Sequence, residues 1–228
     1  MAAAPSPTSR TALLAGATGL IGRALLGRLL DHPAYSRVTV LVRRSPTDLP
    51  AHPKIDPRVV DFSRLPEPFP SADDVYIALG TTIKVAGSQE AFRQVDRDHV
   101  VAVARAARAV GATRLAVVSA LGADARSPVF YNRVKGEMQD AIGHLGYGTL
   151  VIAQPSLLMG DRAALGQPVR NVEMLAAGLL RPLMGWIPRG VRPIAAADVA
   201  QAMLDATLAG KAGTSILGSG LMQAAARR

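Results

Sequence analysis

Hydrophobic positions along this chain follow two alternating patterns, short apolar runs and longer segments with apolar residues at helical spacing. The apolar runs, several of them rich in β-branched residues, begin at Thr11, Arg37, Pro57, Asp74, Thr113 and Thr149. A run that is apolar along its whole length is typical of a strand buried on both faces of a sheet. Because helical segments separate the runs, the pattern predicts an α/β fold, a doubly wound parallel sheet with helices on both faces.

The longest helical pattern covers residues 88–112, where we expect one continuous amphipathic helix. Ser88 is placed to cap its amino end, and Gly111 lies near its carboxyl end. Another helix is expected around Tyr131, and a late one across residues 197–210.

The alternation of strand and helix patterns is lost after Pro155. We therefore expect a single domain over residues 10–228, with a small C-terminal cap over the carboxyl edge of the sheet from about residue 156 onward. Residues 1–9 are small and rich in Pro and Ser, which predicts a disordered leader. The apolar segment 174–188 has three possible roles, as a substrate cap, a dimer surface or ordinary core.

A glycine-rich segment, GATGLIG, directly follows the first predicted strand and opens the first predicted helix. In this context Gly16 allows a tight turn, Gly19 lets a pyrophosphate approach the backbone, and Gly22 lets the helix pack closely on the strand. The free N–H groups at the start of the helix favour phosphate. The alternative is a glycine-rich turn with no ligand. The segment predicts a dinucleotide site made by Gly16, Thr18, Gly19, Leu20, Ile21 and Gly22.

The second predicted strand ends in two arginines, Arg43 and Arg44. An acidic residue near this point holds the ribose 2′-hydroxyl in NAD-specific folds, whereas guanidinium groups pair well with a 2′-phosphate. NADP(H) is therefore favoured over NAD(H) as the cofactor, although two solvated arginines capping a strand end are the alternative. Asp61 and Phe62, at the end of the third predicted strand, are placed to contact the adenine.

The stretch YNRVKGEMQ places Tyr131 four residues before Lys135, so the two share one face of a helix. Ser119 lies at the end of the fifth predicted strand, at the carboxyl edge where ligands bind in parallel sheets. Reduction of a carbonyl needs a proton donor, and a nearby ammonium group makes a tyrosine a better general acid and base. The lysine can also hold the nicotinamide ribose, and the serine hydroxyl can orient the substrate carbonyl. The alternatives are a half-buried helix aromatic and a solvated lysine.

With these motifs in place, the sequence resembles the short-chain dehydrogenase/reductase superfamily from GATGLIG to about Gly160. The segments VKGEMQ, QPSLLMGDR and RPIAAADVAQAML are similar to its small atypical branch, the Tat-interacting-protein-like oxidoreductases. The resemblance implies a Rossmann fold, NADP(H) binding and a catalytic set of Ser119, Tyr131 and Lys135. It further implies cofactor contacts from the loop after the fourth strand and from the segment near the nicotinamide, namely Leu79, Gly80, Thr81, Pro155 and Ser156.

The composition of the chain excludes several other classes of site and partner. The 228-residue chain has no cysteine, which excludes disulfides and a cysteine nucleophile, and its four histidines lack ligand spacing, so no metal site is expected. The net charge of +9 comes from dispersed arginines, so no specific nucleic acid partner is expected. The apolar run from Thr11 is interrupted by glycines and Arg23, so we expect no membrane span and a cytoplasmic protein.

These observations predict an NADPH-dependent oxidoreductase that reduces a small carbonyl or quinone, with Tyr131 as general acid and base. The sequence after the sixth predicted strand is shorter than in the superfamily members that act on nucleotide sugars, which argues against such a substrate. The alternative is an NADPH-binding regulatory or assembly protein with little or no turnover. A homo-oligomer is compatible with either.

Overall fold

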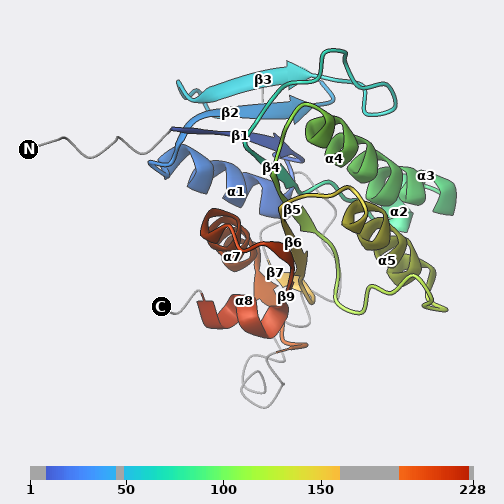
Figure 1. Cartoon of the computed structure of the whole chain (residues 1–228). Helices are drawn as coiled ribbons and strands as arrows, with labels where there is room; N and C mark the ends of the chain where they lie inside the picture. The colour runs from blue at the N-terminus through green and yellow to red at the C-terminus, as the bar shows by residue number, and fades with distance from the viewer. Residues whose placement is uncertain (1–8, 45–48, 160–189, 226–228) are drawn as a thin grey trace, which may run out of the picture.

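The computed structural model describes residues 9–44, 49–159 and 190–225, and within them seven parallel strands form one sheet (Figure 1). The strands are β1 (Arg10–Ala15), β2 (Tyr35–Val42), β3 (Ile55–Val59), β4 (Asp74–Ile77), β5 (Arg114–Val118), β6 (Thr149–Gln154) and β9 (Gly213–Gly218). Their order in the sheet is β3-β2-β1-β4-β5-β6-β9, so the winding reverses between β1 and β4. The predicted doubly wound Rossmann fold is confirmed, and ligands of such sheets bind at the carboxyl ends beside that reversal.

Helices cover both faces of the sheet. They are α1 (Leu20–Asp31), α2 (Ile83–Ala86), α3 (Gln89–Arg93), α4 (His99–Ala109), α5 (Phe130–Gly143), α7 (Ala196–Ala209) and α8 (Ser219–Ala225). Figure 1 shows α1 and α7 side by side on one face and α4 and α5 on the other. Side chains of β1 alternate between the two layers, because successive residues of a strand point to opposite faces.

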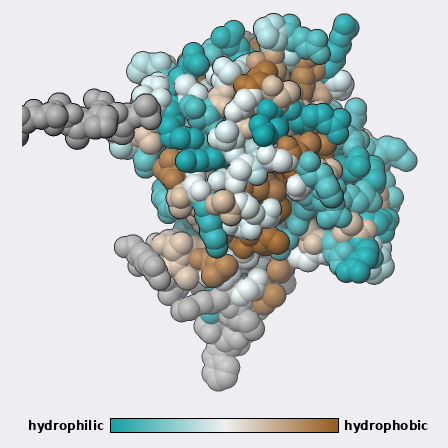
Figure 2. All heavy atoms as spheres, viewed as in Figure 1, coloured by the Kyte–Doolittle hydropathy of each residue, from teal (hydrophilic) through white to brown (hydrophobic). Residues whose placement is uncertain are grey.

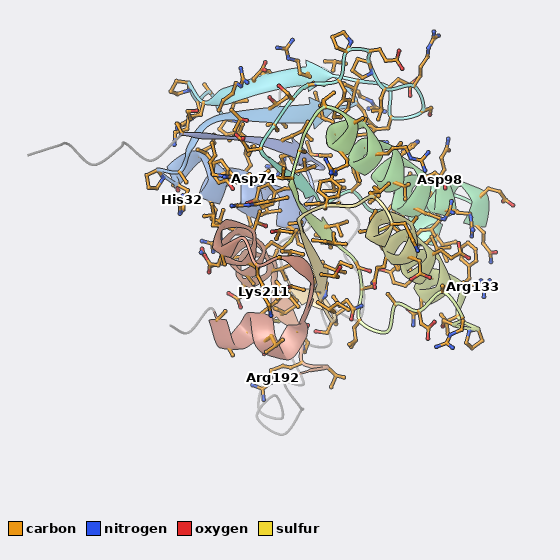
Figure 3. All side chains as sticks on the ribbon, viewed as in Figure 1. His32, Asp74, Asp98, Arg133, Arg192 and Lys211 are labelled. Carbon is orange, nitrogen blue, oxygen red and sulfur yellow. The ribbon has the colours of Figure 1, made fainter. Side chains whose placement is uncertain are left out.

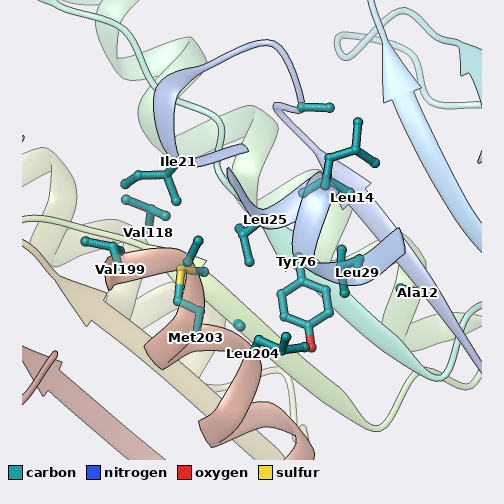
Figure 4. Close-up of a cluster of buried hydrophobic side chains, with 14 of the residues drawn as sticks. Ala12, Leu14, Ile21, Leu25, Leu29, Tyr76, Val118, Val199, Met203 and Leu204 are labelled. Atoms are coloured by element: carbon teal, nitrogen blue, oxygen red, sulfur yellow. The ribbon is translucent and has the colours of Figure 1, made fainter. Parts of the chain in front are cut away.

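Two hydrophobic cores result from this layering. Ala12 and Leu14 of β1 lie in the first core with α1 and α7, and Figure 4 shows Leu14 there with Leu25 and Met203. Leu13 and Ala15 lie in the second core, with α4 and α5. Helices thus cover both faces of the sheet among the described residues. A ligand can therefore approach the sheet at its edges and at the ends of its strands.

The helix expected over residues 88–112 is interrupted. Ser88 does cap it, because its Oγ accepts a hydrogen bond of 3.0 Å from the N–H of Ala91. Gly111 follows it with a φ of +100°, in the left-handed region that favours glycine. Between α3 and α4, however, the chain forms a π-helical turn, η1 (Gln94–Asp98). The amphipathic pattern does not reveal this turn, because a π-bulge adds one residue while the segments on either side keep their helical spacing.

The expectation that the alternation ends after Pro155 is wrong. The helix predicted over residues 197–210 is α7, but it packs against α1 in the main body of the domain. β9 then adds a seventh strand to the sheet, beside β6. Its sequence GTSILG begins and ends with glycine and is partly exposed, so it lacks the long apolar run of a central strand.

A small second sheet follows β6, in which β7 (Leu158–Met159) pairs with β8 (Ile194–Ala195). Residues 160–189 of the expected cap, which include the segment 174–188, lie outside the described residues, as do residues 1–8 of the expected leader. Figure 2 shows polar residues over the α3 and α5 side and hydrophobic ones near α7 and α8. Among the described residues, no helix is both long and apolar enough to cross a bilayer.

Candidate active site

The turn between β1 and α1 gives two of its three glycines a steric reason to be there. Gly16 has a φ of +93°, and a Cβ on it would lie 2.5 Å from the carbonyl carbon and oxygen of Ala78. A Cβ on Gly22 would lie 1.9 Å from the carbonyl oxygen of Gly16. The turn therefore packs directly onto the end of β4, and α1 packs directly onto the turn.

The middle glycine differs from the other two. A Cβ on Gly19 would meet nothing nearer than the Gly16 carbonyl oxygen at 3.5 Å, so packing does not require a glycine there. Gly19 is also the N-cap of α1 and has no side chain with which to cap its first N–H groups. Thr18 beside it is exposed, whereas Ile21 is buried in the core. Bare N–H groups beside a residue without a side chain fit a diphosphate.

The residues expected at the adenosine end lie after the neighbouring strands β2 and β3. Arg43 and Arg44 are exposed and directly follow β2. Asp61 is also exposed, and one of its carboxylate oxygens accepts a 2.8 Å hydrogen bond from the N–H of Ser63. Phe62 is buried, and its ring packs against the imidazole of His99 with 5.9 Å between centroids. Asp61 and the two arginines are therefore accessible to a ligand, whereas the Phe62 side chain packs in the core.

Tyr131, Lys135 and Gln139 lie at four-residue intervals on α5 and form one stripe along it. The Tyr131 ring is half-buried and packs on the buried Phe92 of α3, with centroids 5.3 Å apart. A Cβ on Gly136 would lie 2.1 Å from the backbone nitrogen of Ala125, so α5 packs tightly against the loop that follows β5. These contacts hold the stripe in place at the carboxyl edge.

Lys135 is buried and forms an ion pair with Asp96 that the sequence analysis did not foresee. Its Nζ lies 2.7 Å from Oδ1 of Asp96, and the two side chains are 3% and 1% exposed. The second oxygen of Asp96 accepts a 2.8 Å hydrogen bond from the N–H of Thr81. A Cβ on Gly80 would lie 3.4 Å from Asp96 Oδ1 and 4.0 Å from Lys135 Nζ. The ion pair therefore lies directly beside the loop after β4 that is expected to contact the cofactor.

The sequence signal of Asp96 was hidden in a charged stretch, QVDRD, that has the pattern of a solvated helix face. The π-helical turn changes which of these residues point inward, and Asp96 is the one that becomes buried. π-Bulges occur frequently at functional sites, so an interrupted helix before β5 is the structural signal for this residue.

Ser119 is buried just beyond β5 and contacts the same stripe. Its Oγ accepts a 2.5 Å hydrogen bond from Nε2 of Gln139, and Oε1 of Gln139 accepts one of 3.2 Å from Gln154. Pro155 follows Gln154, and its carbonyl accepts a 3.0 Å hydrogen bond from Leu121. Ser156 is bonded instead to Ser219 of α8. The structure thus brings Ser119 to the stripe through Gln139, a residue that the sequence analysis did not select.

The comparisons with known proteins identify the family of the chain. A family of NAD(P)H-binding domains matches residues 16–144 of the chain. Protein HTATIP2 of Rattus norvegicus is 34% identical over 184 residues, covering 79% of this chain and 72% of that protein. This chain belongs to the NAD(P)H-binding family and is an atypical short-chain dehydrogenase/reductase. The resemblance in the sequence is confirmed.

Fungal proteins are also relatives of this dehydrogenase/reductase. The mitochondrial protein FMP52 of Candida albicans is 32% identical over 195 residues, covering 83% of this chain and 84% of that protein. Several fungal relatives are named as mitochondrial proteins, so the cytoplasmic location of this chain stays a prediction.

Solved structures support the fold of the dehydrogenase/reductase. An oxidoreductase of the short-chain dehydrogenase/reductase family from Burkholderia thailandensis superposes with a TM-score of 0.63 at 19% identity, covering 95% of this chain and 94% of that one. An ADP-L-glycero-D-manno-heptose-6-epimerase from Helicobacter pylori gives 0.67 at 17% identity, covering 92% and 77%. At these identities the likeness concerns the Rossmann fold alone.

Proposed function

We propose that this short-chain dehydrogenase/reductase is an NADPH-dependent oxidoreductase that reduces a small carbonyl or quinone. The observation that carries the proposal is the buried Lys135–Asp96 ion pair, one helical turn from Tyr131 and beside the loop after β4. Removing two charges from water costs free energy that their attraction does not always recover. A buried ion pair is therefore weak evidence that its residues serve only to stabilise the fold. Buried ionisable side chains beside a ligand-binding loop are, in contrast, frequent components of functional sites.

Tyr131 is the proposed proton donor. Its ring is held by Phe92, and it shares the α5 stripe with Lys135. An ammonium group carries three N–H donors, so Lys135 keeps two after its bond to Asp96. Those two donors are suited to the ribose hydroxyls of a nicotinamide nucleotide and to the phenol oxygen of Tyr131.

Ser119 is the proposed orienting group for the substrate. Its oxygen already accepts the N–H of Gln139, so its own hydrogen remains available for donation. A substrate carbonyl oxygen that accepts from Ser119 and from Tyr131 is polarised by two donors. Such preorganised donors stabilise the negative charge that develops on that oxygen.

The residues present fit a nicotinamide dinucleotide, which when bound supplies the hydride. The bare N–H groups after Gly19 suit the diphosphate, and the exposed Arg43 and Arg44 suit a 2′-phosphate. We therefore propose NADP(H) over NAD(H) as the cofactor.

The first experiment is a parallel titration of the purified protein with NADPH and NADH, followed by nicotinamide fluorescence. We expect NADPH to bind at least about tenfold more tightly, since a charge-assisted pair adds about 1.5–3 kcal/mol. In the double variant Arg43→Ala, Arg44→Ala that preference should disappear while NADH binding is retained. A protein that binds neither dinucleotide would contradict the proposal.

Turnover is tested next with Tyr131→Phe on a panel of small aldehydes, ketones and quinones. Losing the proton donor should lower kcat/KM about 100- to 10,000-fold while NADPH still binds. Tyr147→Phe is the matched control, because it removes a phenol that donates to the carbonyl of Ala104 in the second core. If wild type and Tyr131→Phe are equally inactive on the whole panel, the regulatory or assembly alternative replaces the enzyme.

A further inference from the structure

Two serine hydroxyls join the segment after β6 to the C-terminal helix α8. The N–H of Ser156 donates a 2.6 Å hydrogen bond to Oγ of Ser219, and the Ser219 hydroxyl donates one of 2.9 Å to Oγ of Ser156. Oγ of Ser156 donates in turn to the carbonyl oxygen of Arg192, at 2.5 Å. Each hydroxyl thus donates one hydrogen bond and accepts one, so the direction of the whole chain of hydrogen bonds is fixed.

The helix that supplies Ser219 is itself firmly anchored. Ser219 is the first residue of α8 and is almost completely buried, and Met222 of the same helix is buried in the first core. Gln223 donates a second hydrogen bond, of 3.1 Å, to the carbonyl oxygen of Arg192, which lies beside α8 in Figure 3. The helix α8 therefore holds two segments at once, the one that leads into β7 and the one that leads into β8.

The segment that α8 holds adjoins the stripe on α5. Immediately before it, Nε2 of Gln154 donates to Oε1 of Gln139 in the stripe, at 3.2 Å. The carbonyl oxygen of Pro155 accepts a 3.0 Å hydrogen bond from the N–H of Leu121, in the loop that follows β5. With its diphosphate at the turn after β1, a dinucleotide that reaches the stripe has to place its nicotinamide half beside β5 and β6. The segment from Pro155 onward therefore borders the nicotinamide half and not the adenosine half.

We propose that Ser219 is a positioning residue for the nicotinamide half of the cofactor and acts through Ser156. The proposal rests on the dinucleotide binding proposed above and extends the site to the C-terminal helix. A segment that is fixed before binding loses less conformational freedom when the ligand arrives. Without the Ser219 hydroxyl, the N–H of Ser156 loses its acceptor, so the segment has to shift to find another partner.

The test measures the affinities of NADPH and of 2′,5′-ADP side by side, by isothermal titration calorimetry. In Ser219→Ala, NADPH affinity should fall about three- to tenfold, because ordering of the segment must then accompany binding. The affinity of 2′,5′-ADP should change less than about twofold, because this fragment carries the adenosine half alone. Ser219→Thr keeps a hydroxyl and should retain both affinities. Ser215→Ala, in the adjoining strand β9, is the control for losing a serine hydroxyl elsewhere and should change neither.

A second variant, Ser156→Ala, tests whether the two serines act as one chain. It removes the hydroxyl between Ser219 and the Arg192 carbonyl, and it should also weaken NADPH binding while leaving 2′,5′-ADP binding unchanged. The losses should not add in the double variant, because both substitutions break the same chain of hydrogen bonds. Additive losses would mean that the two hydroxyls act independently, which would overturn the proposal.

The remaining outcomes separate this proposal from the cofactor function on which it rests. Equal losses of NADPH and 2′,5′-ADP affinity in Ser219→Ala would make Ser219 a residue of general stability. Undiminished NADPH binding by that variant would also overturn its positioning role, and either result would leave the cofactor function intact. Should Ser219→Ala fail to fold, the presence or absence of the selective loss in Ser156→Ala decides. A wild-type protein that binds no dinucleotide would overturn both proposals.

Discussion

Two aspartates of this protein are almost completely buried at opposite ends of the sheet, and they differ in what surrounds them. Asp74 begins β4, at the amino edge, and is fully buried. Asp96 lies in η1 near the carboxyl edge and is 1% exposed. Figure 3 shows Asp74 among the strands and Asp98, a residue of the same turn as Asp96, out on the helices.

Asp74 is satisfied entirely by groups of the core and the strand ends. Oδ2 accepts hydrogen bonds of 2.7 Å from Nε of Arg10 and 2.7 Å from the hydroxyl of Tyr35, and Oδ1 pairs with the second nitrogen of the same guanidinium at 2.5 Å. The Tyr35 hydroxyl in turn contacts that of Tyr76 at 2.8 Å. This network joins β1, β2 and β4 at their first residues.

Asp96 joins segments that meet at the reversal of the winding. Its partners are a single lysine and one backbone N–H of the loop after β4. Burial alone therefore does not distinguish a structural carboxylate from a functional one. The distinction comes from the end of the sheet, because ligands of parallel sheets bind at the carboxyl ends.

The largest effect is expected from Asp74→Ala, which leaves the Arg10 guanidinium and the Tyr35 hydroxyl without their acceptor. The unfolding free energy should fall by about 3–5 kcal/mol, measured by urea denaturation. NADPH affinity should be unchanged at a temperature where the variant is folded. Unchanged stability together with altered cofactor affinity would contradict the structural role of Asp74.

Asp96→Asn should show the opposite behaviour. The amide keeps the size of the side chain but removes the negative charge opposite Lys135, so the ammonium loses its fixed position. We expect kcat to fall about 100-fold, as for other small displacements of catalytic groups, with a stability loss of about 1–3 kcal/mol. Steady-state kinetics and urea denaturation on the same preparation test both parts. Unchanged kcat would make Asp96 a structural residue like Asp74.

The smallest expected effect is on stability at alkaline pH. It tests the structural role of the network around Asp74. Burial, together with Tyr76 and Asp74, raises the pKa of Tyr35 far above the ordinary tyrosine value, and burial also raises the pKa of Tyr76. The folded state thus favours the protonated phenols, so their contribution is complete below about pH 10 and is lost as pH rises above that value.

Tyr35→Phe should therefore cost about 1 kcal/mol at about pH 8, through its lost hydrogen bonds. The gap to wild type should shrink or reverse at about pH 11, because the raised pKa of Tyr35 costs wild type about 1.4 kcal/mol per pH unit above about pH 10. Urea denaturation at the two pH values measures the gap. A constant gap would show that the pKa of Tyr35 is the same in the folded and unfolded states.

Local patterns in the sequence predicted most of the layering. The first six strands, the glycine turn and the Ser88 cap each depend on neighbouring residues, so they can be inferred from short segments. Asp96 and Gln139 could not be inferred in this way. Their roles depend on a π-helical turn and on a contact with Ser119 across twenty residues of chain. β9 was missed because this partly exposed edge strand begins and ends with glycine and lacks the apolar run of a central strand.

The position of β9 also has a consequence for how the chain folds as it is synthesised. β6 ends at Gln154, and its outer neighbour in the sheet begins only at Gly213. During translation the backbone N–H and C=O groups along that side of β6 stay unpaired until almost sixty further residues have been added, and unpaired strand edges are prone to intermolecular association. Because β9 is synthesised late, the nascent chain exposes a strand edge that is paired in the folded protein.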